Sequence, residues 1–254
     1  MTAADPMRAA SLRAAGRPVL ICYLPLGDPA CAAATAERYV RCGVDVVECG
    51  IPVREATLDG PTISDSMRRA VESGVDTRRA SELLAGQLEA AGGPAAVWMS
   101  YRRDPDDAYL SAVAASGAGG LLLPDADPER IPARAAAHGL LDIPFLDHDP
   151  SPAQVRQAVG AQSYVMVAAA AGVTGMRPEV GADNEELLAR LRAEGVTAPL
   201  ALGFGISTPE HARRAVELGA DGVIVGSACV AAALRGEREL TGLLDSLRGA
   251  LDGH

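Results

Sequence analysis

The sequence contains no lysine, and every strongly basic side chain in it is an arginine. A Schiff-base aldolase needs a lysine amine, and so does an enzyme that holds pyridoxal phosphate covalently. A phosphate-binding P-loop needs one as well. These three kinds of site are therefore excluded, and any chemistry at a carbon–carbon bond must use acid–base groups or a metal.

Aromatic residues are also scarce, at 3% of the chain, although hydrophobic residues as a whole reach 48%. Alanine, leucine and valine must then fill the core, and a disordered chain is not expected. The formal net charge is -10, which disfavours nucleic acid and anionic membranes as partners. An acidic protein can still bind a phosphate, but only at a site where local groups attract the anion.

Cysteine is odd in number and shows no CxxC spacing, so neither a disulfide framework nor a zinc site is predicted. No apolar run reaches the roughly 18 residues of a membrane span. Residues 1–15 lack the apolar segment of a signal peptide. We expect a soluble, cytoplasmic protein that uses no cofactor.

Short apolar runs alternate with amphipathic stretches from one end of the chain to the other. Eight runs have the continuous apolar character of parallel strands covered on both faces: 18–24, 44–49, 95–100, 120–124, 143–146, 163–168, 199–203 and 222–225. Helical stretches lie between them, for example 30–42, 64–73, 106–116, 128–138, 184–193 and 209–218. A short extra helix is predicted over 8–16. Eight such units predict an α/β fold, a single TIM-barrel domain of (β/α)₈ type over residues 1–254, with a doubly wound open sheet as the alternative.

In a barrel of this class the carboxyl ends of the strands and the loops after them carry function. Gly205 lies in the turn after the seventh predicted strand, and Gly226 and Ser227 follow the eighth. Backbone N–H groups of such turns, beside a helix N-terminus, bind phosphate without a basic side chain. Tight turns alone are the alternative explanation, but glycine turns on two consecutive loops favour a phosphate site.

Two acidic residues are the candidates for acid–base chemistry. Glu48 ends an otherwise apolar strand and is expected to point into the barrel mouth, where burial raises its pKa towards a useful value. The alternative is a glutamate that a neighbouring backbone group satisfies. Asp59 precedes a Gly-Pro-Thr segment, and a turn or helix-capping role would explain it on its own.

Six segments together resemble the tryptophan synthase alpha chain family over nearly the whole chain. They are LGDP at 26–29, ECGIP at 48–52, LDGPTIS at 58–64, AGVTG at 171–175, GFGIS at 203–207 and GSACV at 226–230. The family cleaves indole-3-glycerol phosphate to indole and glyceraldehyde 3-phosphate by a metal-free retro-aldol reaction. The resemblance thus implies a lyase of tryptophan biosynthesis with a phosphorylated indole substrate, in agreement with a chain that has no lysine.

The resemblance also implies roles for nine residues. Glu48 matches the catalytic glutamate, which moves protons at the indole C3 and at the glycerol hydroxyl. Asp59 matches the aspartate that accepts the indole N–H and stabilises the cationic intermediate. Tyr23 and Phe204 match walls of the indole pocket, and Thr174 matches a residue that closes over Asp59. The phosphate-binding positions are matched by Gly175, Gly205, Gly226 and Ser227.

Several segments depart from the family pattern. Loops 53–58 and 99–102 differ, although both contact the β subunit in the family, and Ala170 and Met166 replace an arginine and a pocket tyrosine. The chain then either acts without a standard β subunit and releases free indole, or its substrate is altered. The polar trio Asp147, His148 and Asp149 ends the fifth predicted strand, and a metal site is one interpretation of it. Adjacent residues of a strand face opposite sides, however, so that only Asp147 and Asp149 would share a face. A surface turn is therefore favoured for His148 and Asp149.

Two hypotheses of other kinds stay open. A phosphate-binding barrel enzyme with an altered substrate, such as a sugar-phosphate isomerase, predicts an activity indifferent to the indole ring. A non-catalytic or allosteric partner protein predicts ligand binding without turnover. Retention of both Glu48 and Asp59 disfavours the second hypothesis, because a binding protein has no need of a desolvated glutamate.

Overall fold

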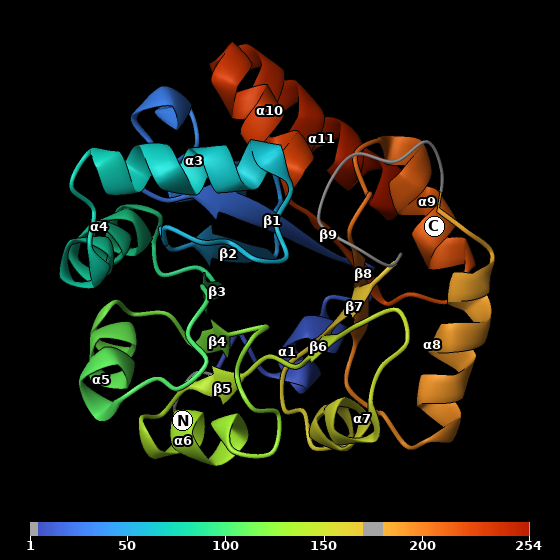
Figure 1. Cartoon of the computed structure of the whole chain (residues 1–254). Coiled ribbons are helices and arrows are strands. Elements are labelled where there is room, and N and C mark those ends of the chain that lie inside the picture. The colour runs from blue at the N-terminus through green and yellow to red at the C-terminus, as the bar shows by residue number, and fades with distance from the viewer. Residues whose placement is uncertain (1–4, 170–179, 254) are drawn as a thin grey trace.

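Parallel strands form the inner layer of the protein, and helices cover them from outside (Figure 1). The computed structural model describes residues 5–169 and 180–253. Within these residues the strands are β1 Val19–Pro25, β2 Val46–Gly50, β3 Ala96–Met99, β4 Gly120–Leu122, β5 Leu141–Asp142, β6 Phe145–Leu146, β7 Val165–Ala168, β8 Leu200–Gly203 and β9 Gly222–Val225. Their order in the sheet is β5-β4-β3-β2-β1-β9-β8-β7-β6.

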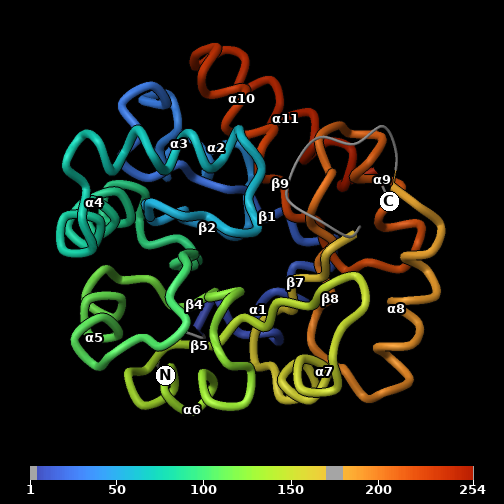
Figure 2. Tube along the Cα trace, viewed as in Figure 1, coloured from blue at the N-terminus to red at the C-terminus, as the bar shows by residue number. Residues whose placement is uncertain are grey.

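Most of the helices lie in a ring around the sheet, whereas the first one lies within that ring, as the Cα trace in Figure 2 shows. In chain order they are α1 Ala9–Ala14, the 3-10 helix η1 Pro29–Cys31, α2 Ala36–Arg41, α3 Pro61–Glu72, α4 Thr77–Ala90, α5 Asp107–Ala115, α6 Ile131–Ala137, α7 Pro152–Val159, α8 Asp183–Ala193, α9 Pro209–Glu217, α10 Ser227–Arg235 and α11 Glu237–Asp252. None of the described helices is long and apolar enough to cross a membrane.

The fifth barrel strand is divided in two, and only its second half falls in the predicted run 143–146. The first half, β5, precedes that run and pairs with β4, and the second half, β6, pairs with β7. Pro144 lies between the halves; it has no N–H to donate, but its carbonyl accepts a hydrogen bond from Met166 N at 2.9 Å. The two halves together occupy the place of one barrel strand, so the predicted (β/α)₈ barrel is confirmed.

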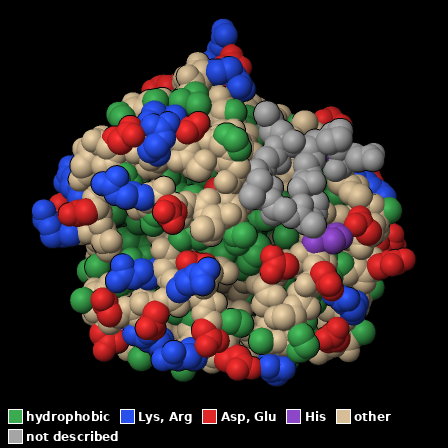
Figure 3. Space-filling view, viewed as in Figure 1, with side chains coloured by type: hydrophobic (Ala, Val, Ile, Leu, Met, Phe, Trp, Pro, Cys, Tyr) green, Lys and Arg blue, Asp and Glu red, His purple; other side chains and the backbone are tan. Residues whose placement is uncertain are grey.

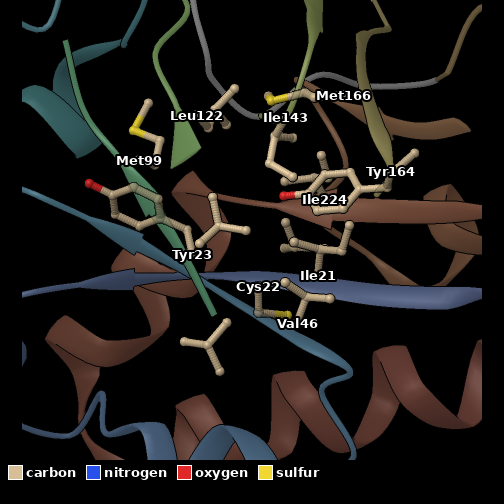
Figure 4. Close-up of a cluster of buried hydrophobic side chains, with 14 of the residues drawn as sticks. Ile21, Cys22, Tyr23, Val46, Met99, Leu122, Ile143, Tyr164, Met166 and Ile224 are labelled. Carbon is tan, nitrogen blue, oxygen red and sulfur yellow. The ribbon is translucent and has the colours of Figure 1, made fainter. Parts of the chain in front are cut away.

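The continuous apolar runs of the sequence correspond to strands that are buried along their length. Every residue of β1, β2, β3 and β9 is buried. Side chains on one face of these strands fill the barrel, and those on the other face pack under helices, so alternation of polar and apolar residues is absent. Ile21, Val46, Ile143 and Ile224 belong to the cluster drawn in Figure 4.

The segment before β1 closes the amino-terminal end of the barrel. Met7 is buried and packs on Gly119 and Gly120, where an added Cβ atom would lie 3.0 Å from the Met7 side chain. Ser163 Oγ donates a hydrogen bond to the Met7 carbonyl at 2.5 Å. The predicted short helix is present as α1, and the predicted site residues sit at the opposite, carboxyl end of the strands.

The single helix predicted over 30–42 was wrong, because two capping side chains divide this segment. The Asp28 carboxylate caps η1 by accepting a hydrogen bond from Ala30 N at 3.0 Å. The Thr35 hydroxyl caps α2 by accepting one from Arg38 N at 3.3 Å. Each cap satisfies N–H groups that a helix leaves open at its start, so the chain begins a helix twice.

Candidate active site

One pocket at the carboxyl ends of the strands gathers the predicted site residues. Its empty space, including the open mouth, is about 520 Å³. Figure 3 shows hydrophobic side chains in the hollow of this face and charged side chains around it. Seven of the nine predicted residues line the pocket: Tyr23, Glu48, Asp59, Phe204, Gly205, Gly226 and Ser227. The other two, Thr174 and Gly175, lie outside the described residues.

Glu48 lies on β2 inside the barrel. Its partners in register are Tyr23 on β1 and Val97 on β3. Its side chain is 3% exposed, and Tyr164 Oη donates a long hydrogen bond of 3.5 Å to its Oε2. Burial raises the pKa of Glu48 to about 8, the negative charge of Asp59 adds to this rise, and the Tyr164 hydrogen bond opposes it. The carboxyl group is therefore mostly protonated near neutral pH and can act first as an acid.

This shifted pKa predicts a pH-dependent stability. An unfolded glutamate loses its proton near pH 4.5, whereas folded Glu48 keeps it until about pH 8. Between these values the folded chain binds more protons than the unfolded chain, so stability falls as pH rises through this window. Glu48→Gln cannot show this loss. When the pH rises from about 5 to about 9, we expect the wild type to lose about 3 kcal/mol in free energy of unfolding relative to Glu48→Gln. Urea unfolding at both pH values tests this, and a difference that does not change with pH would contradict it.

Asp59 lies just before α3 and is 8% exposed. Tyr101 Oη donates a hydrogen bond of 2.8 Å to Asp59 Oδ2, which fixes the carboxylate on the pocket wall. Burial and the Asp59 charge raise the pKa of Tyr101 far above its usual value, so this hydroxyl stays a donor. Tyr101, in the segment after β3, thus orients the Asp59 carboxylate.

Tyr23 extends from β1 and is 1% exposed. Gly50, at the end of β2, makes room for it: a Cβ atom there would lie 1.8 Å from Tyr23 Oη. A glycine at this position is required because the tyrosine ring occupies the space of any side chain. Tyr23 therefore forms part of the pocket wall, as predicted for its place in the sequence.

Phe204 and Gly205 form a turn with unusual backbone angles at the end of β8. Both have positive φ, 62° for Phe204 and 96° for Gly205, and such an angle is strained for a residue other than glycine. The Phe204 ring packs on Phe145 with ring centroids 5.7 Å apart. His211 Nδ1 lies 3.1 Å from the Gly205 carbonyl and holds the turn from α9. The surrounding contacts thus keep Phe204 against the pocket.

Gly226 and Ser227 form the other predicted phosphate turn. Ser227 is the first residue of α10, and Gly226 directly precedes it. The open N–H groups of the first helical turn therefore lie at the pocket, where they favour a negative charge. The predicted phosphate site at these two turns does not depend on a basic side chain. Backbone N–H groups are the local feature by which an acidic chain can bind an anion.

Asp28, in the LGDP segment, serves the structure around the site. Its carboxylate accepts two hydrogen bonds from Arg69, at 3.0 and 2.6 Å, and one from Ser66 at 2.6 Å. Burial raises the pKa of Asp28, but these hydrogen bonds outweigh it and the pKa is lowered. The ion pair ties the turn after β1 to α3, the helix that follows Asp59.

Sequence reasoning missed two tyrosines that bind the candidate acidic groups. In the sequence, Tyr101 stands out only as part of the divergent loop 99–102, and no motif assigns a role to Tyr164. The signal for Tyr164 was its strand position two residues before Met166, which places both side chains on one face. Figure 4 shows Tyr164 and Met166 close to Ile143 and Ile224.

Asp147 and Asp149 are exposed and His148 is half-buried. His148 Nε2 lies 2.9 Å from Asp183 Oδ2, and its Nδ1 lies 3.4 Å from the Ala168 carbonyl. Within residues 5–169 and 180–253, no three His, Cys, Asp or Glu side chains are grouped to hold a metal ion. His148 alone of the three connects the segment after β6 with the start of α8, and Asp147 accepts a hydrogen bond of 3.1 Å from Gln154 of α7.

Fold and site together define a class of protein. It is a (β/α)₈ barrel whose mouth holds a buried glutamic acid with a raised pKa, a second carboxylate that a tyrosine orients, and the two glycine turns after β8 and β9. Such a barrel suits acid–base chemistry on a phosphorylated organic molecule.

A family model described as "Tryptophan synthase alpha chain" matches residues 9–246. The chain therefore belongs to the tryptophan synthase alpha chain family, and the resemblance inferred from six motifs is confirmed. A tryptophan synthase alpha chain from Gloeobacter violaceus is 36% identical over 231 residues, covering 87% of this chain and 83% of that protein. One from Arabidopsis thaliana is 31% identical over 259 residues, covering 95% and 93%. A solved structure of Mycobacterium tuberculosis tryptophan synthase is 32% identical, with a TM-score of 0.83 and 96% of each chain covered.

Proposed function

We propose that the chain is an indole-3-glycerol-phosphate lyase, which cleaves its substrate to indole and glyceraldehyde 3-phosphate in the cytoplasm. One observation carries the proposal: Glu48 and Asp59 line the same largely apolar pocket, and the pKa of Glu48 is raised to about 8. Membership of the tryptophan synthase alpha chain family supports the same substrate.

The first step is protonation of the ring. Protonated Glu48 donates its proton to C3 of the indole, which turns the ring into an electron sink with positive charge at N1. The Asp59 carboxylate, held by Tyr101, accepts the ring N–H and stabilises that charge. Because the pocket walls are apolar, this attraction is stronger than it would be in water.

The second step breaks the carbon–carbon bond. The Glu48 carboxylate takes the proton from the hydroxyl on the glycerol carbon next to C3. The electron pair of the C3–carbon bond returns to the ring and neutralises it, and the hydroxyl carbon becomes the aldehyde. Glu48 ends protonated, as it began, so the reaction consumes no oxidant, reductant or metal.

The phosphate is assigned to the turns at Gly205 and at Gly226–Ser227, which line the same pocket as the two carboxyl groups. Their backbone N–H groups and the start of α10 favour an anion. Gly175 is proposed to contribute to the phosphate site, and Thr174 to closure over Asp59, from the family motif alone. Binding at the far end of the substrate orients C3 towards Glu48.

We further propose that the chain releases free indole without a standard β subunit. The support is the divergence of loops 53–58 and 99–102, in which Arg54, Glu55 and Arg102 are exposed. An altered β-like partner is the alternative that the family suggests.

An indole-release assay on the purified chain, with no other protein present, tests the proposed function. We expect indole and glyceraldehyde 3-phosphate in equal amounts, at a rate that a metal chelator leaves unchanged. Substrate that stays intact in the presence of the enzyme, with or without a β subunit, would reject the activity. Size-exclusion chromatography with a tryptophan synthase β subunit tests the stand-alone proposal, and tight co-elution would overturn it.

A further inference from the structure

The Tyr23 hydroxyl is the unusual polar group of the pocket. It is buried, and it has no hydrogen-bond partner among residues 5–169 and 180–253. A buried hydroxyl without a partner is unfavourable relative to a satisfied one, because it has lost its hydrogen bonds to water and gained none in return. Phenylalanine would give the same aromatic wall without this penalty, so the hydroxyl itself calls for an explanation.

The chain makes specific room for this hydroxyl. The ring extends over Gly50, where an added Cβ atom would meet Oη at 1.8 Å and Cζ at 2.0 Å. Glu48 is paired in register with Tyr23, and Gly50 lies two residues further towards the mouth. The hydroxyl therefore reaches one step beyond Glu48 towards the mouth, and Tyr23 lines the same pocket as Asp59 and Tyr101. Figure 4 shows the ring turned towards Met99 of β3.

The charges around Tyr23 orient its hydroxyl. Burial raises the pKa of Tyr23 well above its usual value, and the carboxylates of Asp59 and then Glu48 raise it further. The group stays protonated, and the negative charge of Asp59 attracts its hydrogen. The oxygen lone pairs are then left to accept a hydrogen bond from a ligand in the pocket that Tyr23 lines.

We propose that Tyr23 is a specificity-determining residue whose oxygen accepts the ring N–H of a heteroaromatic substrate, a hydrogen bond that Tyr23 shares with Asp59. This inference rests on the proposed function, because it takes Asp59 as the main acceptor of that N–H. It assigns to the substrate class a ring that carries an N–H donor. The ligand thereby satisfies the hydroxyl that the free chain leaves without a partner.

Ligands that cannot be cleaved separate binding from catalysis. The probes are 3-(indol-3-yl)propyl phosphate and its benzothiophene counterpart, in which sulfur replaces the N–H; neither carries the glycerol hydroxyl that cleavage needs. We expect Tyr23→Phe to weaken calorimetric binding of the indole ligand by about 5–10-fold, as for the loss of one hydrogen bond. Binding of the benzothiophene ligand should change by less than about twofold.

Thermal unfolding supplies an independent readout. Because Tyr23→Phe removes a polar group that has no partner, we expect the Tm of the free chain to stay constant or to rise by a few degrees. Tyr39→Phe is the matched control: its buried hydroxyl donates a hydrogen bond of 2.7 Å to the Tyr23 carbonyl and lies outside the pocket. That variant should lose Tm and keep the ligand preference of the wild type.

The outcomes are distinct. Equal weakening of both ligands by Tyr23→Phe, or no weakening of either, would overturn the inference and leave the proposed function in place. A clear loss of Tm in free Tyr23→Phe would also overturn it, because the hydroxyl would then serve the fold. If neither ligand binds to the wild-type chain, the proposed function fails and this inference fails with it.

Discussion

Replacement of Glu48 by glutamine is expected to lower kcat for indole release by about 10³–10⁴-fold, the upper part of the range for general acid–base catalysis. The loss is large because one carboxyl group serves both steps, as the acid at C3 and as the base at the hydroxyl. An amide can neither give nor take a proton here. KM should stay within a few-fold of the wild-type value, since the phosphate and the ring keep their other contacts.

The same variant is expected to fold normally. Burial keeps Glu48 protonated up to about pH 8, so a neutral amide of the same shape replaces a group that is already mostly neutral. Asp142→Asn is the matched control, because its carboxyl group also has a raised pKa, about 6, through burial, accepts a hydrogen bond of 2.8 Å from Gln157 and lies outside the pocket. Wild-type-like turnover in Glu48→Gln would reject the role assigned to Glu48.

Asp59→Asn is expected to lower kcat by about 10²–10³-fold, the usual effect of removing one group that stabilises charge in the transition state. The amide oxygen can still accept the hydrogen bond that Tyr101 now donates at 2.8 Å, so the local geometry should persist. What is lost is the negative charge opposite the cationic ring. Steady-state kinetics should therefore show the loss in kcat, with a smaller change in KM.

Asp142→Asn again serves as the control for loss of a buried carboxylate. A second comparison uses the ring itself, because protonation at C3 generates the charge that Asp59 faces. Substrates with electron-donating ring substituents need less help at N1, so they should lose less activity in Asp59→Asn than the unsubstituted compound. If Asp59→Asn lowers kcat by less than about threefold, a group other than Asp59 stabilises the positive charge at the ring nitrogen.

Much of the fold could be predicted from the sequence because each strand of the barrel carries its own local signal. Runs such as 44–49 and 222–225 are mostly apolar, since both faces of each strand are covered. Glu48 could be singled out for the same reason, as a charge near the carboxyl end of such a run. The division of strand five at Pro144 could not be predicted, because the choice of partner on each side depends on neighbouring strands. That residues 1–254 form a single domain stays a prediction.

The partners of the acidic groups were beyond prediction. Tyr101 and Asp59 are separated by 42 residues, and Tyr164 and Glu48 by 116. No periodicity links residues so far apart, and only closure of the sheet brings them within hydrogen-bond distance. The Phe204–Gly205 turn shows the same limit: a positive φ at a phenylalanine has no sequence signature, and tertiary contacts impose it.

By itself, the sequence determined the order of strands and helices, the absence of lysine chemistry and the motifs that place this chain in its family, because these are properties of short segments. The tertiary structure alone decided which groups share the pocket, how far the pKa of Glu48 moves and that the Tyr23 hydroxyl has no partner within the described part of the chain. Burial and distance set these properties. Both arise only when strands from all parts of the chain close into one barrel.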